Sequence, residues 1–94
     1  MSTDTDQRSL LERPLELHPD VALRPEPFGA LAYHYGTRRL VFLKHPDVVN
    51  LVRSLAGHPT FSAALDACGI SAGRRASFTR AVESLLASGI VRER

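Results

Sequence analysis

Four histidines, two tyrosines and one cysteine are the first candidates in this 94-residue chain for nucleophilic, acid–base or metal chemistry. Zinc sites need paired short spacings of Cys and His, whereas His18, His34, His45 and His58 are scattered and Cys68 stands alone. His45 and His58 each precede a proline at the start of an expected helix, where capping or solvent exposure is their ordinary role. Cys68 falls on an apolar helical stripe and is expected in the core. The sequence therefore predicts no catalytic residue, no metal site and no cofactor.

Length and composition predict one folded domain with an acidic arm. A chain of this size can bury a single modest core, and its lone cysteine excludes an internal disulfide and fits a reducing cytoplasm. Apolar stretches are too short to cross a membrane. Residues 1–20 carry five acids against two arginines, whereas residues 21–94 carry ten basic residues against five acids. We expect residues 1–20 to be a flexible acidic arm and residues 21–94 a basic domain that attracts acidic partners.

The arm contains four leucines in the run LLERPLELHPD, with Pro14 and Pro19 preventing a continuous helix. Three roles remain open for these leucines: disorder, packing on the core, or weak competition for the site of a bound peptide.

A β-hairpin is the clearest local element. In GALAYHYGTRRLVFLK, a two-residue turn at Gly36-Thr37, with glycine at positive φ, follows one strand and precedes another, and residues 21–25 supply an earlier strand. We expect the bulkier face of the hairpin to cover the helical core and the smaller face to be the more polar one. The bulkier face consists of the pairs Tyr33–Leu40 and Leu31–Phe42, with Tyr35–Arg38 at the turn, and the smaller face of His34–Arg39, Ala32–Val41 and Ala30–Leu43.

Three helices are predicted after the hairpin. The first begins at Pro46 and ends by Gly57, the second begins near Thr60, and the third covers residues 71–88. The pairs Gly69-Ile70 and Gly89-Ile90 are typical of Schellman caps. The order predicts an α+β domain of winged-helix type, with a three-stranded antiparallel sheet followed by three α-helices.

The last strand, residues 38–44, is the one feature that indicates a function. In a three-stranded meander this strand is an edge, and its free N–H and C=O groups can bind an extended peptide. Proline at outward N–H positions among Arg39, Val41 and Leu43 is expected to abolish such binding. The alternative is an edge that Arg38, Arg39 and Lys44 merely protect from aggregation.

Residues 23–55, LRPEPFGALAYHYGTRRLVFLKHPDVVNLVRSL, closely resemble the mycofactocin-system peptide chaperones, and the helical remainder fits the same family. The run RPEPFGALAYHYG is the most distinctive part. That family is similar to the pyrroloquinoline quinone peptide chaperone and to the recognition elements of ribosomally made, modified peptides. The resemblance covers residues 21–94 and not the arm.

The resemblance implies a non-enzymatic chaperone that binds the leader of the mycofactocin precursor peptide by strand addition. It implies a second partner, a radical S-adenosylmethionine (SAM) enzyme that modifies the precursor. The implied peptide-binding residues are Arg39, Leu40, Val41, Phe42, Leu43 and Lys44 on the third strand and Arg74, Arg75, Phe78, Arg80 and Val82 on the third helix.

Two other functions remain open. The second and third helices could form a helix-turn-helix of a nucleic-acid-binding protein, although basic residues are scattered and serines occupy the positions where base-reading side chains would be expected. Alternatively, two edge strands could pair in a homodimer.

Overall fold

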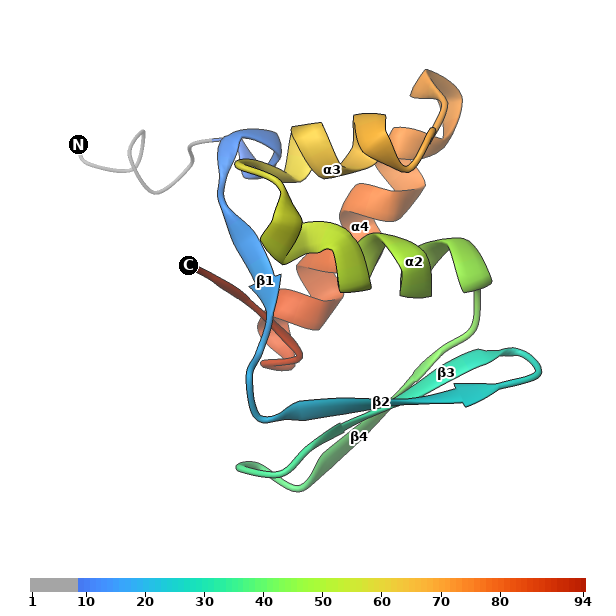
Figure 1. The fold of residues 1–94 in the computed structure, drawn as a ribbon, viewed down its shortest axis with the longest axis vertical. Helices are drawn as coiled ribbons and strands as arrows, with labels where there is room; N and C mark the ends of the chain where they lie inside the picture. The colour runs from blue at the N-terminus through green and yellow to red at the C-terminus, as the bar shows by residue number, and fades with distance from the viewer. Residues whose placement is uncertain (1–8) are drawn as a thin grey trace.

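The computed structural model describes residues 9–94, and Figure 1 shows how its elements are arranged. Its class is α+β, as the sequence predicts. A three-stranded antiparallel sheet of order β2-β3-β4 lies at one end of the molecule, and helices lie on one side of it. The elements in chain order are the 3-10 turn η1 (Leu10–Glu12), β1 (Leu15–Leu17), β2 (Val21–Glu26), β3 (Gly29–His34), β4 (Arg39–Leu43), α2 (Pro46–Ser54), η2 (Leu55–Gly57), α3 (Phe61–Ala67), η3 (Ala72–Arg74), α4 (Arg75–Ala87) and β5 (Val91–Glu93).

The β3–β4 hairpin has the predicted register but not the predicted turn. Ala32 pairs with Val41, and His34 pairs with Arg39. The loop between them has four residues, and Arg38, not Gly36, has the positive φ, 63°. The buried His34 ring stabilises this loop, because its Nδ1 accepts the N–H groups of Gly36 at 3.0 Å and of Thr37. The predicted two-residue turn and the observed four-residue loop place the same residues opposite each other. The predicted register was therefore correct, although the predicted type II′ turn was wrong.

The predicted orientation of the sheet was also wrong. Ala30, Ala32 and Leu43, from the smaller face, are buried in the core, whereas Leu40 and Phe42 on the bulkier face are exposed. The reason is the closeness of α2, which packs on β3. Small side chains let the helix approach the sheet, and the aliphatic side chains of α2, α3 and α4 then supply the bulk of the core.

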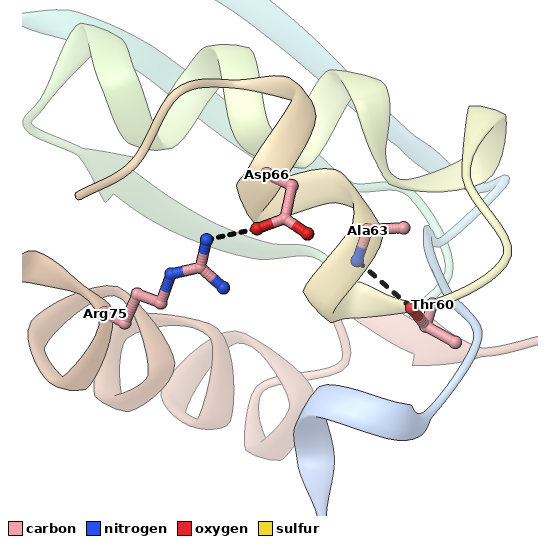
Figure 2. Close-up of polar contacts among 4 residues, drawn as sticks. All are labelled: Thr60, Ala63, Asp66 and Arg75. Atoms are coloured by element: carbon pink, nitrogen blue, oxygen red, sulfur yellow. Dashed lines mark hydrogen bonds and ion pairs between the residues drawn. The ribbon is translucent and has the colours of Figure 1, made fainter. Parts of the chain in front are cut away.

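The helices follow the predicted signals closely. Pro46 opens α2, and Thr60 caps α3 by accepting the N–H of Ala63 at 3.1 Å (Figure 2). Both predicted Schellman caps are confirmed, since the N–H of Ile70 reaches Leu65 O at 3.1 Å and the N–H of Ile90 reaches Leu85 O at 2.9 Å. The third helix differs at its start, where η3 precedes the regular turns of α4. Cys68 is half-buried against the core, beside Ser54.

Residues 10–17 are not a flexible arm. Leu15 is fully buried in the core, and β1 pairs with β5 in an antiparallel two-stranded sheet (Figure 1). Two ion pairs flank the strands, Arg13 with Glu93 at 2.8 Å and Arg92 with Glu16 at 2.6 Å. Of the three open roles of the leucines, core packing holds for Leu15, while residues 1–8 of the predicted arm lie outside the described residues. The strand β5 also settles the conformation of the C-terminal segment.

No helix within residues 9–94 combines the length and apolarity needed to cross a membrane. In the same residues, no three His, Cys, Asp or Glu side chains come close enough together to hold a metal ion.

Candidate peptide-binding site

The edge of β4 presents unpaired main-chain groups at two residues. The N–H of Tyr35 donates to Asp20 O at 2.9 Å, in register with the β2–β3 pairs. Because bonded and non-bonded pairs alternate in antiparallel strands, the even-numbered residues of β3 turn their main-chain groups towards β4. Their partners Arg39, Val41 and Leu43 therefore complete the sheet. Leu40 and Phe42 direct their N–H and C=O groups outward, which reverses the positions expected from the sequence.

A groove runs beside this edge, between β4 and α4. It comprises two cavities of about 340 Å³ and about 200 Å³ that share His45, Val48 and Ala81 in their linings. The smaller cavity lies beside β4, where the half-buried Val41 and the buried Leu43 form one wall. The larger cavity continues along the N-terminal half of α4. A strand added to β4 would turn alternate side chains into this groove.

Small residues on α4 leave room for the groove. Ser77, Ala81 and Ser84 line it at helical spacings of four and three residues, so they share one face of the helix. These three residues are not among the site residues expected from the sequence. A signal for them does exist in the sequence. A stripe of serine and alanine beside an apolar stripe indicates a helix face that belongs neither to the core nor to a charged surface.

The residues predicted on the third helix occupy different surroundings. Phe78 and Arg74 line the larger cavity, with the Arg74 guanidinium 4.8 Å from the centre of the Phe78 ring and 2.9 Å from an Asp47 carboxylate oxygen. Val82 is fully buried in the core and does not line the groove. Arg75 pairs with Asp66 on α3 (Figure 2) and lines neither cavity.

Exposed cations border the groove on both sides. Lys44 lines the smaller cavity, and Arg80 is exposed on α4 three residues after Ser77 and four before Ser84, which places it at the rim. Arg39 is exposed at the start of β4. The site therefore offers main-chain donors and acceptors, an apolar groove and positive charge. These features can hold an extended peptide.

Comparison with known proteins identifies the family of the chain. The family model described as "Peptide chaperone MftB family" matches residues 14–92. The peptide chaperone MftB of Mycolicibacterium smegmatis is 49% identical over 75 residues, which are 80% of this chain and 74% of that protein. The peptide chaperone MftB of Mycobacterium tuberculosis is 40% identical over 80 residues, 85% of this chain and 73% of that protein. No solved structure matches the chain significantly. Together, the family match and these identities show that the chain belongs to the MftB peptide chaperone family.

Proposed function

We propose that this protein binds the leader of the mycofactocin precursor peptide as a fourth strand beside β4 and presents the precursor to a radical SAM enzyme. The observation that carries the proposal is the outward-facing main chain of Leu40 and Phe42 beside the groove along α4. A chaperone of this kind supplies binding and orientation, and the bond chemistry belongs to the enzyme.

The two edges of the sheet differ in a way that favours β4. On β2, the residues that face away from β3 are Val21, Leu23 and Pro25, by the same alternation. The N–H of Val21 already donates to His18 O at 2.9 Å, and Pro25 has no N–H. An added strand would find one free donor on β2, at Leu23. Proline at an outward position is a common protection of sheet edges, and β4 has none.

The charge of the rim favours an acidic leader. Lys44, Arg80 and Arg39 have no ion-pair partner among the described residues, so their charges are available to a ligand. Arg74 contributes less, because Asp47 already neutralises part of its charge. Exposed charges of this kind mainly accelerate association and weaken with salt.

The nucleic-acid alternative loses support from the same ion pairs. Arg74 and Arg75, which would begin the recognition helix, are engaged by Asp47 and Asp66. A duplex contact requires many unpaired cations at phosphate spacing. Homodimerisation through β4 competes for the same edge as the leader, so the leader should dissociate any such dimer.

Proline at position 40 tests strand addition. Leu40→Pro removes an outward N–H without breaking the β3–β4 ladder, and its ring blocks an added strand. We expect the affinity for a labelled leader peptide to fall at least about tenfold, as measured by fluorescence anisotropy.

Leu40→Ala is the matched control, because it keeps the N–H and loses only a side chain that points away from the groove. It should bind the leader within about threefold of the unmodified protein. Leader affinity unchanged in a folded Leu40→Pro variant would rule out addition at β4. A parallel titration with duplex DNA at physiological salt should show no binding in the leader's concentration range.

A further inference from the structure

The sheet face that turns away from the helices is unusually apolar for an uncovered surface. We call it the outer face; its aromatic and leucine residues are 28, 31, 33, 35, 40 and 42, and β2 adds Ala22, Arg24 and Glu26 at its border. Four are clearly exposed: Phe28 at 38%, Tyr35 at 65%, Leu40 at 51% and Phe42 at 55%. In Figure 1, no described element covers this side of the sheet. Contiguous exposed apolar patches are uncommon on monomers and generally mark interaction sites.

Aromatic contacts fix the shape of the outer face before any partner binds. Phe28 and Phe42 stack at a centroid distance of 5.8 Å, and Tyr33 meets Tyr35 edge to face at 4.9 Å. These pairs come from different parts of the sheet and limit the freedom of each ring. A rigid cluster of aromatic side chains loses little conformational entropy on binding, which is the property of interface hot spots.

A second copy of the chain does not suit this face. Residues 21–44, which form the sheet, carry four basic residues and one acid, so two outer faces would meet with charges of the same sign. The single acid, Glu26, is 3.2 Å from Arg24. The charge favours a partner whose apolar patch has an acidic border.

The outer face is continuous with the proposed leader edge. Leu40 and Phe42 offer their main chain to the leader and their side chains to the outer face. A leader strand beside them would place alternate side chains on the same face and widen it by about a third, one strand in three. The bound leader and the chaperone would then form one surface.

From this continuity, and resting on the proposed function, we propose that the outer face is the docking surface for the enzyme that receives the precursor. We further propose that this enzyme binds the widened face of the leader-loaded chaperone more tightly than the face of the free chaperone. By linkage, the enzyme then strengthens leader binding by the same factor. The enzyme thus selects chaperones that carry substrate.

The test measures enzyme affinity with and without peptide. The purified mycofactocin radical SAM enzyme is titrated by calorimetry into the chaperone alone and into the chaperone saturated with leader peptide. We expect at least about threefold tighter binding to the loaded form. Equal affinities would overturn the selective part of the proposal. Failure of the unmodified protein to bind leader at all would instead overturn the proposed function.

Two variants locate the surface. Phe28→Ser with Tyr35→Ser removes exposed rings outside the β4 edge and should weaken enzyme binding about tenfold or more, while leader affinity stays within about twofold. Arg24→Glu with Arg38→Glu should weaken it as well, and this variant leaves every ring in place. Arg53→Glu, an exposed charge reversal on α2, is the matched control and should have no effect. Unchanged enzyme affinity in both double variants, or a change confined to self-association, would overturn the assignment.

Discussion

At the scale of single residues, the hairpin that carries the site depends on two positions inside its own sheet. His34 is 5% exposed and accepts two loop N–H groups, so a side chain that could have served catalysis is committed to shaping the turn. Gly29 begins β3 at a φ of 149°, and a Cβ there would lie 2.1 Å from the carbonyl oxygen of Leu43. No other residue type fits without moving the end of β4.

Gly29→Ala should therefore destabilise the protein and loosen the edge that binds peptide. We expect a loss of about 2–4 kcal/mol in the free energy of unfolding, measured by urea denaturation. Gly57→Ala is the control, because a Cβ at Gly57 meets nothing within 4 Å. Similar stability of the two variants would mean that the close approach to Leu43 has no energetic weight.

At the scale of elements, local signals were readable from the sequence and distant ones were not. Helix caps, the hairpin register and the edge position of β4 depend on neighbouring residues, and all three were predicted correctly. The orientation of the sheet was predicted wrongly. Side-chain bulk favours burial of Leu31 and Phe42 over Ala30 and Ala32, whereas the closeness of α2 requires small residues on the buried face. The β1–β5 pair joins segments about 75 residues apart, and no local pattern marks it.

Some residues of the site likewise could not be predicted from the sequence. Of the implied site residues, Arg74, Phe78 and residues 41–44 line the groove, whereas Arg39 and Leu40 do not. Val82 lies in the core because its apolar stripe on α4 faces inward. Val48, which lines both cavities, belongs to α2. Only the packing of α2 between the sheet and α4 brings this residue to the groove.

Leu15 gives the β1 element a measurable role in stability. Leu15→Ala should lower the free energy of unfolding by about 2–5 kcal/mol, since it leaves a cavity in the core. Leu17→Ala, at a half-buried position of the same strand, should cost less. Leader affinity of folded Leu15→Ala should be unchanged, because β1 does not line the groove. Tighter leader binding would instead support competition by the N-terminal segment.

At the scale of the whole molecule, the basic body predicted from the sequence divides into paired and available cations. Arg75 serves the packing of α4 against α3 through Asp66, whereas Arg80 borders the groove. The arginines among the implied peptide-binding residues therefore have separate roles.

Charge reversal at these two positions should separate the roles. Arg80→Glu should slow leader association several-fold at low salt, with the difference shrinking as salt rises. Arg75→Glu should change leader association little and thermal stability more. Stopped-flow measurements of leader association at two salt concentrations check both expectations. Equal effects of the two variants on the association rate would show that only the net charge of the protein matters, not the position of each arginine.

The account's central claim is that the leader adds as a strand to β4, and residue-resolved amide hydrogen exchange tests it most directly. In the free protein, the amides of Leu40 and Phe42 should exchange fast, while those of Val41 and Leu43 are protected by the ladder with β3. Saturating leader peptide should slow Leu40 and Phe42 by about tenfold or more and leave the outward amide of Leu23 on β2 unchanged. Fast exchange at Leu40 and Phe42 in the leader-saturated protein would contradict the account.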